Sequence, residues 1–316
     1  MRECKLLKTL GKGGRILSAS CKLTKVSEVS VLLKRARIRM LTWEVAIQTG
    51  WWTFDHSEPF FSRLLHLFVA QGLRPLSYAA AEMLQDCGQL DIKEHRGKTP
   101  LLVAAAANQP KIVKDLILLG ADINAMDQKG QTVLHLGATY GLPSVIEVRL
   151  RQTCWIDENT FFYGVCTGLT PLHCAVMALN AAFQTQNMEP LSQHHLQHLL
   201  LCIQRLLQLG ADYKSQDLKS SKTILHLAVQ AANLPLVQFL LKLPGQERQN
   251  FVNIKAHGNT ALHMAAGLHG HPYQEQIVRL LLDHWADPTA RNPENEQPVH
   301  LLTTGPAAEQ VSWAFE

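Results

Sequence analysis

Gly97-Lys98-Thr99-Pro100-Leu101-Leu102-Val103-Ala104-Ala105 is the stretch of this 316-residue chain that decides the fold. Thr99 is a favourable helix N-cap, and Pro100 suits the first helical position, where a backbone N–H has no partner inside the helix. The apolar residues that follow fall on one helical face. Ala104 and Ala105 are small, so a second helix can approach closely. The stretch therefore predicts a short helix packed against a neighbour.

The same frame recurs along the chain. Counted from Thr to Thr, the steps are 33, 38, 53 and 37 residues. The clear copies are Gly130–His135, Gly168–His173, Thr223–His226 and Gly258–His263, and the weaker copies are Gln297–His300 and Leu64–His66. Length alone suggests about two domains, whereas a recurring frame indicates one stacked array with insertions.

A second apolar helix pattern follows the first in three of the copies, at Ile112–Leu119, Ile203–Leu209 and Ile277–Leu282. Gly120 and Gly210 come next, and glycine supplies the left-handed C-cap that ends such a helix. Short turns then lead to the next Thr. This is the ankyrin-repeat pattern. The predicted fold class is all-α, an ankyrin-repeat solenoid of about six to seven helix-turn-helix units with short β-hairpin turns.

The repeats divide the chain into two parts. Residues 1–58 form a basic N-terminal region that we expect to be poorly ordered. Residues 59–316 form the ankyrin-repeat domain. Its repeats are expected near 60–93, 94–126, 127–164, 165–217, 218–254 and 255–291, with a partial repeat at 292–316.

Several positions depart from the repeat pattern. Extra residues fall at 153–166 and 184–198, and the polar, Pro-interrupted second insertion predicts an extended loop between the two helices of the fourth repeat. Trp285 stands where the C-cap glycine belongs. A bulky residue in a left-handed conformation costs about 1–2 kcal/mol, so we expect that corner to be strained or rebuilt. In the first repeat, Arg63 replaces the capping Thr.

Residues between the repeat positions resemble the IκB family, and within it the nuclear, atypical members. The stretches that carry the resemblance are Leu90–His95, Ala107–Pro110, Leu225–Asn233 and Asn292–Leu301. The resemblance implies a nuclear protein, with some cytoplasmic presence, that binds Rel/NF-κB dimers of p50 type. It would modulate NF-κB-dependent transcription in inflammatory and immune responses. The alternative is a generic ankyrin adaptor for a partner outside the Rel family.

Ankyrin proteins bind their partners through the hairpin tips and the inner helices, which line a concave face. The resemblance therefore assigns partner contacts to the predicted tips. These residues are His95, Arg96 and Lys98; Gln128, Lys129 and Gln131; and Lys255, His257 and Asn259.

Fifteen His residues are a high count, yet many recur at one repeat position. Repetition at a fixed site indicates hydrogen bonding at the repeat junction rather than catalysis. The structural repeat motif comprises Thr99, His135, Thr170, His173, Thr223, His226, Thr260, His263 and His300. His194-His195-x-x-His198 has spacing that could bind a metal, but a solvated tract is the favoured interpretation in a polar loop. We expect no enzyme activity, cofactor, metal or small-molecule substrate.

Charge is unevenly distributed. Residues 1–40 carry eleven Lys/Arg and two Glu, whereas residues 59–316 carry 19 Lys/Arg and 21 Asp/Glu. A near-neutral repeat domain is poorly suited to bind DNA, so DNA would be reached through the Rel partner. Within the basic region, Lys34–Arg39 could be a nuclear import signal, the whole of residues 1–40 also resembles a mitochondrial transit peptide, and an incidental exon explains them equally well.

The cysteines and the apolar runs indicate the redox compartment and whether the chain could span a membrane. Seven Cys without a Cys-x-x-Cys pair, and no glycosylation acceptor, favour a reducing intracellular compartment with buried structural thiols. The longest apolar run, Leu101–Ala107, is far shorter than the roughly 18 residues that a membrane span needs, so no membrane association is expected.

Overall fold

The computed structural model describes residues 59–86, 88–94, 96–152, 168–184, 191–243 and 248–302. Within these residues the chain is helical, and β structure is limited to a single bridge between Ala256 and Asn259. The helices are α2 (Pro59–Ala70), α3 (Arg74–Asp86), α4 (Pro100–Ala106), α5 (Pro110–Leu118), α6 (Val133–Thr139), α7 (Pro143–Gln152), α8 (Pro171–Gln184), α9 (Leu191–Gln208), α10 (Ile224–Gln230), α11 (Leu234–Leu241), α12 (Arg248–Val252), α13 (Ala261–Ala266), α14 (Gln274–Asp283) and the 3-10 helix η3 (Pro298–Leu301).

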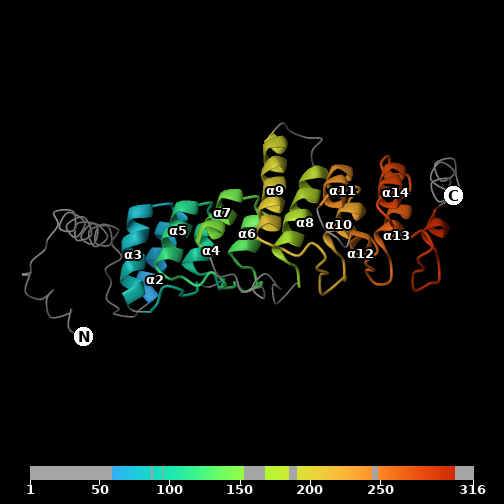
Figure 1. Ribbon diagram of the computed structural model, residues 1–316. Helices are drawn as coiled ribbons and strands as arrows, with labels where there is room; N and C mark the ends of the chain where they lie inside the picture. The colour runs from blue at the N-terminus through green and yellow to red at the C-terminus, as the bar shows by residue number, and fades with distance from the viewer. Residues whose placement is uncertain are drawn as a thin grey trace, which may run out of the picture. The chain divides into compact units, whose positions relative to one another are not determined.

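The helices stand in pairs, side by side (Figure 1). The first members of the pairs contact one another in succession, from α2 through α4, α6, α8, α10 and α13 to η3. Among the second members, α3 contacts α5, α5 contacts α7, and α7 contacts α9. The predicted all-α ankyrin solenoid is therefore confirmed, with six helix pairs and the start of a seventh unit among the described residues.

The core runs along the array because each pair buries its apolar face against its neighbours. The Leu two residues after the capping Thr is at most 1% exposed in every clear copy. These residues are Leu101, Leu134, Leu172, Leu225 and Leu262. A single pair of helices could not cover such residues, so burial depends on stacking.

The extended loop predicted at 184–198 is wrong for residues 191–198, which form the first turns of α9. Leu199, Cys202, Ile203 and Leu206 are fully buried at helical spacing, so α9 has one apolar face. The polar residues near its start occupy the solvated face of that helix. The polar residues were interpreted as a loop, whereas in the structure they are the exposed side chains of a helix. The other insertion, 153–166, lies outside the described residues.

The corner at Trp285 keeps the left-handed conformation, with φ +69°. Its N–H bonds to the carbonyl of Leu282, and the N–H of Ala286 bonds to that of Leu281. The glycine corners at Gly120 and Gly210 show the same pair of bonds, so the turn has not been rebuilt. The corner was expected to be either strained or rebuilt, and a left-handed Trp in an unchanged turn corresponds to the strained form.

The basic N-terminal region, including Lys34–Arg39, and residues 303–316 lie outside the described residues. Over the described helices, none combines the length and apolar character needed to cross a membrane.

Candidate partner-binding surface

A Thr and a His cap the first helix in four of the repeats. Each Thr is the N-cap and each His is the third helical residue. The Thr N–H donates to the imidazole Nδ1 at 3.2–3.4 Å, and the Thr hydroxyl lies 2.8–2.9 Å from the same nitrogen. The pairs are Thr132–His135, Thr170–His173, Thr223–His226 and Thr260–His263. Since Nδ1 accepts a backbone hydrogen, the ring hydrogen belongs on Nε2.

The Nε2 side of the ring reaches the next repeat. It donates to the carbonyl of Leu169 from His135 at 3.0 Å, and to that of Lys222 from His173 at 3.0 Å. His263 makes the equivalent bond to Glu296 at 3.2 Å. The first helix pair has no capping Thr, yet the Nε2 of His66 lies 3.1 Å from the carbonyl of Lys98. Each of these bonds ends in the loop segment that precedes the next first helix.

Burial holds these imidazoles in the neutral form. Desolvation lowers the pKa of His135, His173 and His263, and it lowers the pKa of His226 to about 4. The Nε2 of His226 is buried without a hydrogen-bond partner among the described residues, although backbone groups of Ile254 and Asn259 lie near the ring. A neutral ring is required because protonated Nδ1 could not accept the Thr N–H.

Two repeats use variants of this cap. At Thr99 the third helical residue is Leu102, and its N–H donates to the Thr hydroxyl at 3.4 Å. At η3, Gln297 takes the place of Thr, and its N–H donates to Nδ1 of His300 at 3.1 Å. The cap therefore persists at both positions with altered chemistry.

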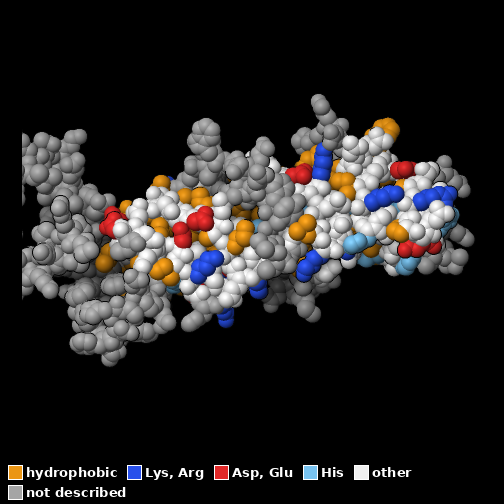
Figure 2. Space-filling view, turned by 90° about the horizontal axis from the view of Figure 1, so that it is seen from below, with side chains coloured by type: hydrophobic (Ala, Val, Ile, Leu, Met, Phe, Trp, Pro, Cys, Tyr) orange, Lys and Arg blue, Asp and Glu red, His pale blue; other side chains and the backbone are white. Residues whose placement is uncertain are grey.

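The predicted tip residues lie in loops along one edge of the array, the lower edge in Figure 1. Arg96, Gln128, Lys129, Lys255 and His257 are exposed, and Lys98, Gln131 and Asn259 are half-buried. His95 lies outside the described residues. Figure 2 views the array from the side of these loops and shows Lys and Arg spaced along it rather than gathered in one patch.

Neighbouring tips are joined by hydrogen bonds. The N–H of Gln128 donates to the carbonyl of Arg96 at 3.4 Å. The Lys255 Nζ donates to the carbonyl of Arg291 at 2.9 Å, and the Gln216 side-chain amide donates to the carbonyl of Lys255 at 2.9 Å. Hydrogen bonds therefore join the tips at Arg96 and Gln128, and the tips at Gln216, Lys255 and Arg291, so that each of these tips has a fixed position relative to its neighbour. The series of tips is called the tip row below, and its member before α8 lies outside the described residues.

Two tips of this row were missed by sequence reasoning, at Asp217–Lys222 and at Asn292–Glu296. Asp217–Lys222 makes the corresponding turn before α10, with Leu218 67% exposed. The turn closes with Ser221 at φ +50° instead of a glycine, so the usual signal was absent. The other predicted tips begin about four residues before an N-cap Thr, so the same spacing counted back from Thr223 would have located this turn.

The first helices also present apolar side chains that sequence reasoning did not single out. Tyr140 directly follows α6 and is 51% exposed, and Met177 on the adjacent α8 is 46% exposed. Cys174, Leu227 and Met264 occupy the position four residues after the capping Thr and are half-buried. Apolar side chains on the first helices and polar tips beside them provide the two kinds of contact that a protein interface uses.

The sequence matches the family model for ankyrin repeats in three copies, at residues 61–148, 101–184 and 194–292. It is 59% identical over 247 residues to NF-kappa-B inhibitor delta of Mus musculus, an alignment that covers 78% of this chain and 75% of that protein. This chain belongs to the IκB family of ankyrin-repeat proteins. The resemblance stated from the four sequence stretches is therefore confirmed.

The four stretches resemble NF-kappa-B inhibitor delta most and NF-kappa-B inhibitor zeta second, and the sequence identities follow the same order. NF-kappa-B inhibitor zeta of Mus musculus is 45% identical over 260 residues, covering 78% of this chain but 35% of that longer protein. The crystal structure of the ankyrin repeat domain of Bcl-3, described as a unique member of the IkappaB family, superimposes with a TM-score of 0.63. It shares 28% identity and covers 83% of this chain and 99% of that one.

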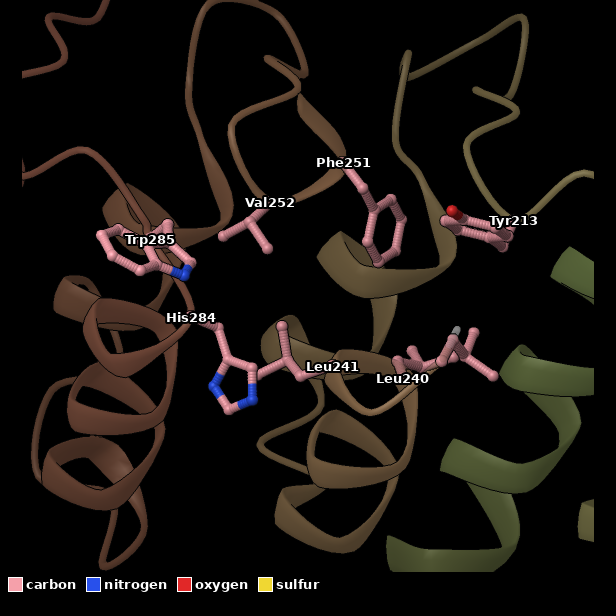
Figure 3. A pocket seen from close by; sticks show the side chains of 8 residues that line it. Tyr213, Leu240, Leu241, Phe251, Val252, His284 and Trp285 are labelled. Carbon is pink, nitrogen blue, oxygen red and sulfur yellow. The ribbon is translucent and has the colours of Figure 1, made fainter. Parts of the chain in front are cut away.

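A hollow opens in this IκB array between the ends of α11 and α14 and the short helix α12 (Figure 3). Its lining residues are Tyr213, Leu240, Leu241, Leu243, Phe251, Val252, His284 and Trp285. The rings of Tyr213 and Phe251 meet edge to face, with centroids 4.9 Å apart. The volume of about 50 Å³ suffices for a few waters, not for a drug-sized ligand.

The chemically reactive side chains of the described residues do not form a site of three or more metal-binding groups. Burial raises the pKa of the Cys174 thiol to about 11 and that of Cys202 to about 12. Such thiols stay protonated and unreactive at neutral pH.

Proposed function

We propose that this protein binds Rel/NF-κB dimers, preferentially of p50 type, through its hairpin tips and first helices. In the nucleus it modulates NF-κB-dependent transcription in inflammatory and immune responses. The observation that carries the proposal is the tip row, in which hydrogen bonds join neighbouring tips between Gln128 and Arg96 and again between Lys255 and Arg291. Membership of a family whose relatives are named as NF-kappa-B inhibitors supports the choice of partner.

The tip row suits a folded protein partner. Its described tips precede α4, α6, α10, α13 and η3, so a partner lying along it could bury more than about 2,000 Å², which is the range of large, specific complexes. The tips are positioned by the His–carbonyl bonds before any partner arrives, which reduces the entropy lost on binding.

DNA is reached through the Rel partner in this proposal. The repeat domain has 19 basic and 21 acidic residues, and phosphate binding needs a marked basic excess. The protein acts without catalysis, cofactor, metal or small-molecule substrate in this role. The tip residues Arg96, Lys98, Lys129, Gln131 and Lys255 contact the partner directly, together with the remaining predicted positions His95, Gln128, His257 and Asn259.

The test is capture of purified p50 dimers by the immobilised full chain, followed by capture from nuclear extract with mass spectrometry. The double variant Lys129→Ala/Lys255→Ala should weaken binding of purified p50 by about tenfold, because both side chains are exposed tip residues. Its melting temperature should fall only slightly, since the bond from Lys255 to Arg291 that it removes is exposed. Lys111→Ala is the matched control, since Lys111 is an exposed lysine on α5, away from the tips.

Two results would contradict the proposal. A folded chain that retains no Rel subunit would leave the generic adaptor as the better interpretation, particularly if another protein is retained at the tips. Equal loss of binding in the tip variant and in Lys111→Ala would show that p50 is held by general charge.

A further inference from the structure

The helical start of α9 brings two histidines to one face. His194 and His198 are separated by four residues, and residues four apart on a helix are neighbours on its surface. Their ring centroids lie 4.6 Å apart with the rings nearly perpendicular, at 85°. In an extended loop, as predicted from the sequence, this spacing would not have brought the rings together.

We propose that His194 and His198 together bind a divalent transition-metal ion, for which Zn²⁺ is the best fit. Imidazole suits zinc, and two histidines at this helical spacing can coordinate one ion. Two nitrogens bound at zinc–nitrogen distances of 2.0–2.1 Å around a tetrahedral ion are about 3.3 Å apart. Ring centroids 4.6 Å apart allow that separation with side-chain rotation alone.

His195 is not part of the pair, although it is adjacent in the sequence. Its exposed ring lies beside the turn between α6 and α7, where a Cβ added to Gly141 would be 3.1 Å from its Cε1 atom. The following helical position also points about 100° away from that of His194. The sequence motif of three histidines thus separates into a pair on one helical face and an exposed His195 that is directed elsewhere.

The site has two protein ligands within the described residues, where no cluster of three or more His, Cys, Asp or Glu occurs. The ion's remaining positions are open to water or to a ligand from another molecule, unlike a closed structural zinc site. Binding clamps the first turns of α9, which rises above its neighbours in Figure 1. The site is independent of the tip row and of Rel binding.

The experiment is calorimetric titration of the full chain with ZnCl₂ at pH 7.5, on the wild type and three Gln variants. His194→Gln and His198→Gln should each weaken the site by about tenfold or more, because a single imidazole loses the advantage of chelation. His195→Gln is the matched control and should retain the wild-type affinity. All three positions are exposed or half-buried, so Gln should leave the fold intact by circular dichroism.

Hydrogen exchange supplies a second measurement at the site itself. Zn²⁺ should slow exchange of the backbone amides at the start of α9 in the wild type and in His195→Gln, but not in His198→Gln. Equal zinc affinity in the wild type and His198→Gln would overturn the proposal. So would equal loss in all three variants, since that result describes a non-specific histidine tract.

Discussion

Acidification should destabilise the repeat array through His226, whose ring is fully buried. Burial lowers its pKa in the folded chain to about 4, compared with the ordinary value of 6.5 expected in the unfolded chain. Below pH 6.5 the His226 imidazole is therefore protonated in the unfolded chain but remains neutral in the folded chain. Stability must fall as the pH drops from 6.5 to about 4.

The size of the effect follows from the two pKa values. At pH 5, protonating the imidazole stabilises the unfolded chain by about 2 kcal/mol, while the folded chain gains less than about 0.1 kcal/mol. At pH 7 the imidazole is largely neutral in both states, so the corresponding difference is negligible. His226 alone should thus lower the free energy of unfolding by about 2 kcal/mol between pH 7 and pH 5. His135, His173 and His263, whose pKa values are also lowered, add to the wild-type loss.

The assay is urea unfolding followed by circular dichroism at pH 7 and pH 5, on the wild type and His226→Gln. Gln at the third helical position can accept the Thr223 N–H as in a capping box, yet it does not titrate. The loss of stability between the two pH values should be about 2 kcal/mol smaller in the variant. His195→Gln removes an exposed histidine and should behave as the wild type. Identical losses in the wild type and His226→Gln would refute the reasoning.

Three positions with positive φ give two further predictions, both measured by thermal unfolding. Trp285→Gly should raise the free energy of unfolding by about 1 kcal/mol, because Trp285 is 72% exposed and occupies a left-handed conformation that glycine adopts without strain. Gly258→Ala should lower the free energy of unfolding clearly more than Gly210→Ala does. The two glycines have nearly equal φ values of +84° and +85°, but a Cβ at Gly258 would lie 2.4 Å from the Pro293 ring, whereas one at Gly210 meets nothing within 4 Å. Equal losses of stability in the two variants would show that backbone strain, and not the contact with Pro293, determines the effect.

The helices that could be predicted from the sequence are those with their own local signals. Thr99 with Pro100 marked the start of α4, and Gly120 marked the end of α5, because caps are made by residues next to each other in the chain. The start of α9 had no such signal. Its helical form depends on the burial of Leu199 and Ile203 against the rest of the array, which a local reading of polar residues does not register.

The candidate surface was predictable to the same extent. Tips that turn on a glycine, such as the one at Gly130, were located from the sequence, whereas the tip that turns on Ser221 was not. Tyr140 and Met177 carry no signal of their own, because an exposed apolar residue on a helix looks like a core residue until the buried face is known.

The histidine bonds explain why insertions leave the tip row intact. His135 bonds to a carbonyl 34 residues ahead, and His173 bonds to one 49 residues ahead, yet both distances are 3.0 Å. Of the additional residues of the fourth repeat, residues 191–198 form the first turns of α9, on the far side of the repeat from the loops (Figure 1). The tips therefore keep their register whatever the length of the helices behind them. Residues added to those helices, His194 and His198 among them, are free to acquire chemistry that the partner surface does not constrain.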